Sequence, residues 1–323
     1  YKVVSPGDFI ISLRSFQGGL EYSRYKGICS PAYIILRARI AIEDLFFKEF
    51  FKTYSYILQL KSKLEGIRDG KMVSYKYFSE TIIPYPTLPE QQKIAEFLTA
   101  VDEKIGKLKR KKELLEAYKK GAMQKLFSQE IRFKDDQGNP YPDWEEKRGN
   151  EVFDRITDKN HNSDLPILAI SQEHGAIPRE MIDYDISVTA DSVASYKIVC
   201  PGDFVISLRS FQGGLEYSKY KGICSPAYII LRSMISIEDL FFKEFFKTYN
   251  YILQLKSKLE GIRDGKMVSY KYFSETILPF PSLPEQQKIA EFLTGIDDKI
   301  KAVANQIDKA AEFKKGLLQK MFV

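Results

Sequence analysis

The chain has 323 residues, which is enough for roughly two domains, and its 44% hydrophobic content allows packed cores. The 49 basic and 43 acidic residues leave a net charge of +6, compatible with an acidic partner such as nucleic acid but also common without one. Cys29, Cys200 and Cys224 argue against a disulfide framework, so we expect a reducing cytoplasm. No apolar run approaches membrane-spanning length.

Residues 1–85 predict a β-rich domain. Short β-rich runs at 9–13 and 32–36 are separated by turns that contain glycine and serine. A helical stripe follows, and in its later copy it includes Leu240 and Leu255, with Ser236 as the expected N-cap. The next segment, 66–82, predicts a loop flanked by glycines that leads into a short strand.

Residues 86–127 predict a long connector helix. Pro84, Pro86 and Pro89 form a stiff extended lead, and the last of them suits the first turn of a helix. Apolar residues then recur at alternating spacings of four and three, which is a heptad pattern. The predicted seam of this helix comprises Ile94, Leu98, Val101, Ile105, Leu108 and Leu115.

Residues 128–282 predict a second, complete domain of the same kind. Its leading part, 128–195, opens with turn signals around Gly138 and Pro140, and we expect Trp144 to pack in the core there. The remainder of this leading part predicts further short strands. Residues 283–323 then predict a second connector helix, whose seam comprises Ile289, Leu293, Ile296, Ile300, Val303 and Ile307, with one heptad break at Lys314.

Residues 196–322 repeat residues 1–127 at a constant offset of 195, and 88 of the first 99 aligned pairs are identical. The leading part 128–195 has no counterpart before Tyr1, so we expect the first domain to lack its beginning here. Two long apolar stripes favour an antiparallel coiled coil between the helices, with the domains related by a pseudo-twofold axis. The alternative is that each helix docks separately on its own domain.

The phrase LPEQQKIAEFL, followed by a heptad helix that ends in KKGAMQKLF or KKGLLQKMF, resembles the specificity subunits of type I restriction–modification systems. The segment RFKDDQGNPYPDWEEK is similar to the start of a target-recognition domain in that family. The resemblance implies an α+β fold with two β-rich recognition domains separated by two long helices. It also implies a non-catalytic subunit in which each domain recognises half of a bipartite double-stranded DNA site and the coiled coil sets the spacer.

The resemblance further implies partners: adenine-N6 methyltransferase subunits and endonuclease/translocase subunits. The residues agree, since no phosphate-binding loop, dinucleotide fingerprint or methylation motif is present, and we expect no cofactor, metal or catalytic residue. The alternative is a coiled-coil scaffold for protein interactions, without sequence-specific DNA binding. Alanine substitutions of Arg209 and Lys266 that left DNA affinity unchanged would favour that alternative.

Two polar turn segments in each copy are the predicted DNA contacts, because arginine, glutamine and lysine can reach base edges and phosphates. Their simpler interpretation is ordinary solvated turns. The run 107–112 is interpreted as a solvated helix face. The predicted DNA-contacting residues are Arg14, Ser15, Gln17, Gly18, Arg68, Lys71, Lys76, Arg209, Ser210, Gln212, Gly213, Arg263, Lys266, Tyr270 and Lys271.

Overall fold

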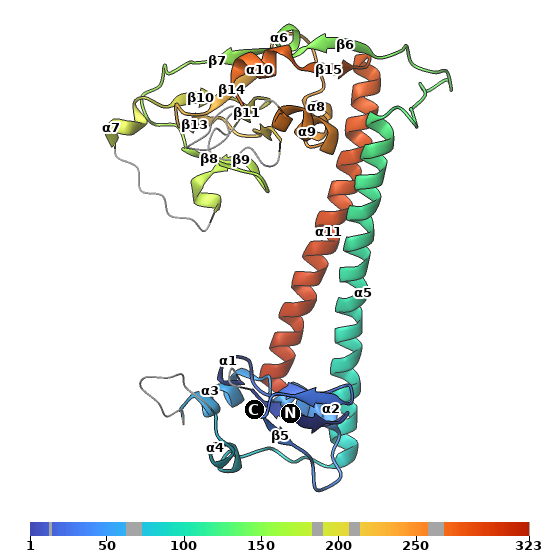
Figure 1. Cartoon of the computed structure of the whole chain (residues 1–323), viewed down its shortest axis with the longest axis vertical. Helices are drawn as coiled ribbons and strands as arrows, with labels where there is room; N and C mark the ends of the chain where they lie inside the picture. The colour runs from blue at the N-terminus through green and yellow to red at the C-terminus, as the bar shows by residue number, and fades with distance from the viewer. Residues whose placement is uncertain (13–14, 63–72, 183–189, 207–213, 258–267, 323) are drawn as a thin grey trace. The chain divides into compact units, whose positions relative to one another are not determined.

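The computed structural model describes residues 1–12, 15–62, 73–182, 190–206, 214–257 and 268–322. It contains two compact units (Figure 1). The first unit comprises Tyr1–Leu114 and Ile300–Val323, and the second comprises Leu115–Lys299. Each unit combines short strands with helices, so the predicted α+β class with two β-rich domains and two long helices is confirmed.

In its described residues, the first unit has two small antiparallel sheets. Strand β1 (Lys2–Val4) pairs with β4 (Gly27–Cys29). Strand β2 (Phe9–Ile11) lies between β3 (Glu21–Tyr22) and β5 (Ile34–Leu36). The predicted runs 9–13 and 32–36 therefore become β2 and β5, each shorter than expected.

In the part of this unit that the structure describes, four short helices accompany these sheets: α1 (Ser15–Gly18), α2 (Asp44–Phe50), α3 (Tyr54–Ser62) and α4 (Tyr75–Ser79). The apolar faces of α2, α3 and α4 meet β2 in one core, where aromatic residues dominate and Leu20 is fully buried. The core includes Phe9, Phe46, Phe47, Phe50, Phe51 and Tyr56.

The second unit has the larger sheet, in the order β12-β11-β14-β7. Its members are β7 (Phe153–Ile156), β11 (Phe204–Ile206), β12 (Glu216–Tyr217) and β14 (Ile229–Ser233). Among the described residues of this unit there are also three two-stranded sheets, and all their pairings are antiparallel. These pairs are β6 (Glu145–Arg148) with β15 (Ile277–Phe280), β8 (Leu168–Ser171) with β9 (Gly175–Pro178), and β10 (Lys197–Val199) with β13 (Gly222–Cys224).

The short helices of the second unit correct three expectations. The single helical stripe is two helices, α8 (Asp239–Phe245) and α9 (Tyr249–Ser257), and Glu238 rather than Ser236 caps the first. The predicted loop contains α10 (Tyr270–Glu275), because Ser269 accepts a hydrogen bond from the helix's first turn. The leading part, expected to be strands, also contains α6 (Gly149–Val152), the 3₁₀ helix η1 (Arg179–Met181) and α7 (Ala190–Val193).

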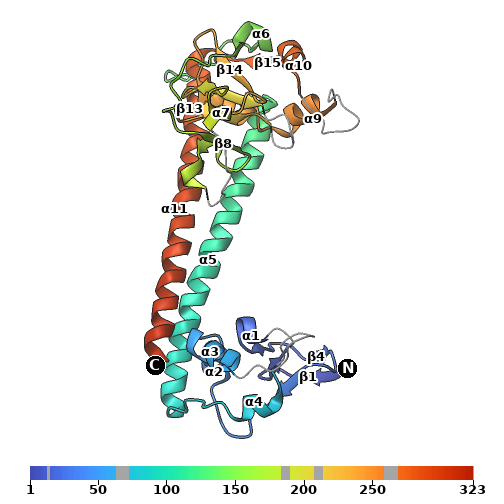
Figure 2. The same cartoon turned by 90° about the vertical axis from the view of Figure 1, so that its left-hand side faces the viewer.

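The long helices α5 (Leu88–Phe127) and α11 (Leu283–Met321) each contribute to both units. In the first unit the beginning of α5 runs beside the end of α11, and Figures 1 and 2 agree on this. The Lys314 ammonium of α11 lies 2.7 Å from Asp102 of α5 and 2.7 Å from Glu49 of α2. The helices are therefore antiparallel within this unit.

The second unit repeats this arrangement with the helices exchanged. Lys119 of α5 lies 2.8 Å from Asp297 of α11 and 2.7 Å from Glu244 of α8. Lys119 and Lys314 occupy equivalent positions of the repeat. The lysine that interrupts the heptad pattern in α11 therefore forms an ion pair between the two helices, as its equivalent in α5 does.

The predicted seam positions lie at buried or half-buried sites of the two helices. In the first unit these are Ile94, Leu98, Val101, Ile105, Leu108, Ile300, Val303 and Ile307. In the second unit they are Leu115, Ile289, Leu293 and Ile296. The end of α11 also reaches the first unit's aromatic core, where Phe322 lies 5.1 Å from Phe46 between ring centroids.

Among the described residues, no helix combines the length and the apolar character needed to cross a membrane.

Candidate nucleic-acid interface

The first predicted contact segment begins where the central strand of each domain ends. In the first unit, Gln17 and Gly18 in α1 are exposed, and Ser15 belongs to the same short helix. Arg14 lies outside the described residues. The equivalent residues of the second unit, Arg209, Ser210, Gln212 and Gly213, all lie outside the described residues as well.

The glycine that closes this segment has an internal packing role. Gly19 and Gly214 have φ values of +76° and +89°, a backbone region that disfavours side chains. A Cβ atom on either glycine would also overlap a carbonyl oxygen, that of Phe51 in the first unit and of Phe246 in the second. These two glycines therefore bring the segment close to the end of α2 or α8, a role that lies within the domain.

The second predicted contact segment leads into α4 and α10. Lys76 and Lys271, at equivalent positions, are exposed on these helices. The Tyr270 hydroxyl donates a hydrogen bond of 3.2 Å to the Phe153 carbonyl, so this tyrosine also holds α10 against β7. The other predicted contacts here, Arg68, Lys71, Arg263 and Lys266, lie outside the described residues.

Two further arginines are held by ion pairs inside the domains. Arg37 donates two hydrogen bonds of 2.7 Å to Asp8, and Arg232 donates two of the same length to Asp203. The bond from Arg37 outweighs burial and lowers the pKa of the Asp8 carboxyl. These guanidinium groups therefore tie β5 and β14 to the residues that directly precede β2 and β11.

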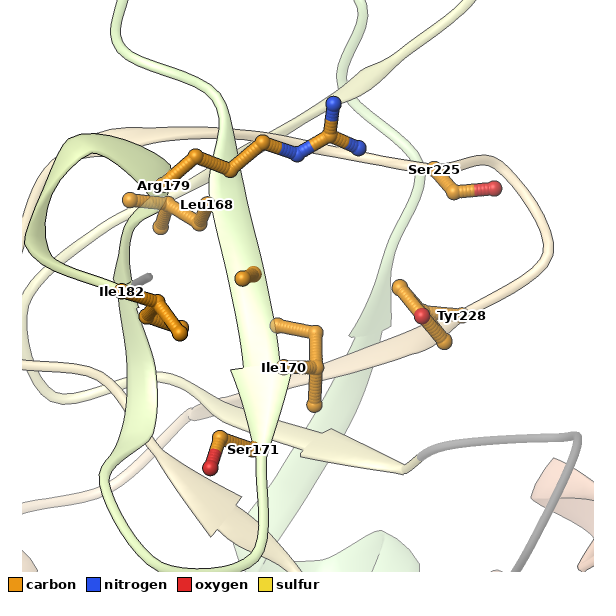
Figure 3. A pocket seen from close by; sticks show the side chains of 8 residues that line it. Leu168, Ile170, Ser171, Arg179, Ile182, Ser225 and Tyr228 are labelled. Carbon is orange, nitrogen blue, oxygen red and sulfur yellow. The ribbon is translucent and has the colours of Figure 1, made fainter. Parts of the chain in front are cut away.

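A pocket of about 330 Å³ lies in the second unit beside β8. Apolar side chains, Leu168, Ile170 and Ile182, line part of it, and Figure 3 shows the Arg179 side chain extending along it. The hydroxyl-bearing residues Ser171, Ser225 and Tyr228 also line it.

The pocket combines a mainly apolar wall with a few polar side chains. A guanidinium offers several donors in a fixed plane, hydroxyls donate or accept, and the apolar residues provide a flat contact for a ring or methyl group. The buried Lys197 ammonium donates a 2.7 Å hydrogen bond to the Tyr228 carbonyl and so fixes the backbone that carries this residue.

Sequence inspection did not identify this pocket. Arg179 directly follows Pro178, the last residue of β9, and it belongs to the leading part 128–195, which has no second copy in the chain for comparison. Its lining residues come from separate segments that only the fold brings together. The polar turn around Gly175, with an arginine after it, was the available signal.

Within the described part of the chain, no group of three or more histidine, cysteine or acidic side chains is placed to hold a metal ion.

The model of one protein family, the type I restriction modification DNA specificity domain, matches residues 2–117 and 141–312. The chain is similar to the putative type I restriction enzyme MjaX specificity subunit of Methanocaldococcus jannaschii, with 28% identity over 254 residues. That alignment covers 73% of this chain and 57% of the relative. The MjaVIII specificity subunit of the same organism is 27% identical over 344 residues, covering 98% of this chain and 78% of the relative.

A similar fold occurs in the crystal structure of the type I restriction-modification S subunit from M. genitalium. The TM-score is 0.58 at 16% identity, and the match covers 100% of this chain and 84% of that one. The family match spans both copies of the repeat and most of the chain, so the family resemblance predicted from the sequence is confirmed. The chain belongs to the family of type I restriction modification DNA specificity domains.

Proposed function

We propose that this protein is the DNA sequence-specificity subunit of a type I restriction–modification complex. Residues 1–85 and 128–282 act as recognition domains, each for one half of a bipartite duplex site. Residues 86–127 and 283–323 form the connector that sets the spacer between the halves. The subunit itself performs no chemistry.

The main support for this proposal is that the chain contains the same unit twice and that both copies match a family of DNA specificity domains. Both copies combine a β-rich domain with a long helix, and the family match covers both. Within each unit the two helices run antiparallel and are joined by an ion pair from a half-buried lysine to an aspartate. Such a connector suits a subunit that must hold two recognition domains at a defined separation.

The Arg179 pocket is the proposed base-contacting site of the second domain. Arginine can form two hydrogen bonds to guanine, while exposed lysines such as Lys271 supply phosphate contacts without sequence preference. Loss of a bidentate base contact costs about 1–3 kcal/mol of discrimination, whereas loss of a phosphate contact weakens all sequences alike. The two residue types therefore predict different experimental signatures.

The proposed partners are adenine-N6 methyltransferase subunits and ATP-dependent endonuclease/translocase subunits. The exposed faces of α5 and α11 are the proposed docking surface for the methyltransferase. Copurification of the tagged chain with coexpressed methyltransferase subunits, at a fixed stoichiometry, tests this part of the proposal. Failure to copurify at low ionic strength would contradict it.

Selection from a randomised duplex library, using the complex with its methyltransferase subunits at moderate salt, tests the main proposal. We expect enrichment of a bipartite motif with a constant spacer. In the Arg179→Ala complex, we expect one half of the motif to relax by about tenfold or more while the other half is retained. Lys271→Ala is the matched control and should reduce affinity without changing the motif. Equal binding of all duplexes by the unmodified complex would refute the proposal.

A further inference from the structure

The turn between β8 and β9 is the exposed end of a two-stranded sheet in the second unit. Residues 172–174 form this turn, and each of their side chains is exposed. The Arg179 pocket begins beside the turn, because its lining includes Ser171, the last residue of β8. Figure 3 shows Ser171 and Arg179 at opposite ends of the pocket. The turn and the proposed base-contacting arginine therefore lie at the two ends of one pocket.

Two features hold the turn in place. The Ser171 hydroxyl accepts hydrogen bonds from the backbone N–H groups of Glu173 at 3.3 Å and His174 at 3.4 Å. Gly175 follows with a φ of +75°, and a Cβ atom there would lie 2.4 Å from the Tyr217 carbonyl oxygen, so this position packs directly on the backbone of β12. A turn that is held in this way has less conformational freedom to lose when it binds a partner.

Glu173 and His174 form an exposed pair of a hydrogen-bond acceptor and a donor. Oε2 of Glu173 lies 3.8 Å from Nε2 of His174, and the side chains are 83% and 51% exposed. Among the ion pairs of the described residues, Glu173 has no partner other than His174. The carboxylate can accept several hydrogen bonds and the imidazole can donate one, so both side chains can still bind a ligand in solvent.

The edge of a C·G base pair matches this pair of side chains. The major groove of B-form DNA admits a two-stranded β-ribbon, and there a C·G pair presents the cytosine amino group beside the O6 and N7 acceptors of guanine. A carboxylate accepts from the cytosine amino group, whereas phosphate oxygens repel it. An exposed glutamate in a DNA interface therefore contributes to sequence discrimination and not to general affinity.

We infer that the β8–β9 turn recognises one C·G base pair in the half-site of the second domain. Glu173 accepts a hydrogen bond from the cytosine amino group, and His174 donates one to the acceptor edge of the guanine. This inference rests on the proposed function and adds to it two specificity-determining residues that do not line the Arg179 pocket.

The geometry of β9 gives the distance between the two contacts along the DNA. The strand has four residues, which span roughly 13 Å at about 3.3 Å per residue. Base pairs follow one another at about 3.4 Å along the helix axis. With the ribbon along the groove, the base pair at the turn lies about four positions from the one that Arg179 contacts, within the same half-site.

The alternative is a solvated turn that does not contact DNA, and Glu173→Gln separates the two. Glutamine keeps the shape of glutamate but replaces one acceptor oxygen with an NH₂ donor group. A glutamine side chain pairs with the N6 and N7 atoms of adenine. If Glu173 contacts a base, this variant should change the preferred base pair and not only weaken binding.

Selection from a randomised duplex library, by the complex with its methyltransferase subunits, tests the inference. We expect the unmodified complex to enrich a motif with a C·G pair in the half that Arg179→Ala affects. Glu173→Gln should shift this position towards A·T, and Glu173→Ala or His174→Ala should relax it by about tenfold, with the other half retained. Asp164→Asn, at an exposed position before β8, is the matched control for the loss of one negative charge and should leave the motif unchanged.

The outcomes separate this inference from the proposed function. A complex that selects a bipartite motif unaffected by Glu173→Gln would overturn the inference and leave the proposed function in place. Relaxation in the half that Arg179→Ala does not affect would overturn it too. Equal binding of all duplexes by the unmodified complex would refute the proposed function itself. We expect the Glu173 variants to keep the urea midpoint of the unmodified chain, and a lowered midpoint would assign the turn a structural role instead.

Discussion

Replacement of Lys314 by methionine should destabilise the first unit selectively. The ammonium of Lys314 joins the end of α11 to Asp102 and Glu49, at 2.7 Å from each. Burial by itself would lower the pKa of Lys314, but the two carboxylates outweigh it and raise this pKa above 10.5. Methionine retains the aliphatic stem and removes the charge, so the change tests the ionic contact rather than the packing.

The size of the expected loss in unfolding free energy depends on how well the two remaining carboxylates are compensated in the variant. Removing one partner of a buried ion pair costs about 3–5 kcal/mol. Here the side-chain exposure is 18% for Lys314 and 7% for Glu49, but 38% for Asp102, which water can solvate. Lys48 also remains 2.6 Å from Glu49. We therefore expect a loss of about 2 kcal/mol from the free energy of unfolding of the first unit.

Native-state hydrogen exchange under increasing urea measures the two units separately. Lys314→Met should lower the protection of α2 and of the beginning of α5, while amides of α8 stay unchanged. Lys119→Met is the matched variant and should reverse the pattern, because Lys119 makes the equivalent contacts with Asp297 and Glu244. Lys309→Met, at an exposed position of α11, is the control for a general loss of charge.

A loss of less than about 0.5 kcal/mol for Lys314→Met, indistinguishable from that of Lys309→Met, would be typical of an exposed ion pair and would contradict a buried ionic contact. Equal destabilisation of both units by either single variant would also contradict it. The sign of the pH dependence provides a further check. Since the folded pKa is raised, the contribution of Lys314 is present below pH 10.5 and is lost as the pH rises through the folded pKa.

Three other outcomes are expected. Phe322→Ala, at an 8% exposed position in the first unit's core, should cost about 3 kcal/mol of that unit's stability, measured by urea-dependent exchange; unchanged protection of α2 would contradict it. Glu285→Gln should cost about 2–3 kcal/mol, because this fully buried carboxylate accepts bonds from Trp144 at 2.9 Å and from Arg132 at 2.9 and 3.1 Å. The fluorescence of Trp144, the single tryptophan, reports this change, and an unchanged urea midpoint would refute it. Burial by itself would raise the pKa of Glu244, yet two neighbouring lysines hold this pKa below 4.5. The contribution of Glu244 to the stability of the second unit should therefore be present above pH 4.5 and be lost as the pH falls. An acid titration in which hydrogen exchange of the second unit showed the opposite trend would exclude this.

The structure explains where sequence patterns misplaced the short helices. Heptad spacing identifies α5 and α11 because long amphipathic helices keep one period over many turns. The apolar run across α8 and α9 has helical spacing too, but a short turn that includes Thr248 separates the two helices. The Thr248 hydroxyl donates a hydrogen bond to the Phe245 carbonyl at the end of α8. Such local capping competes with periodicity over short stretches and is weakly encoded in any single residue.

Part of the candidate site could be predicted from the sequence. Exposed Lys76 and Lys271 belong to segments that composition alone marks as polar turns. The Arg179 pocket could not be predicted in this way, since its lining comes from β8, η1 and the turn that carries Ser225 and Tyr228. Side chains from distant segments meet only once the strands have paired, and strand register is a tertiary property.

The duplication, the α+β class, the two long helices and the family can be recognised in the linear sequence, because repeats and heptads are patterns that a chain displays directly. Tertiary contacts, by contrast, bring the end of each long helix against the domain of the other copy, through Lys314 in the first unit and Lys119 in the second. Tertiary contacts also bury Ile223 in the second unit, where Leu165 and Ile167 pack against it. Burial depends on which segments cover a residue, and a residue's own sequence context does not contain that information.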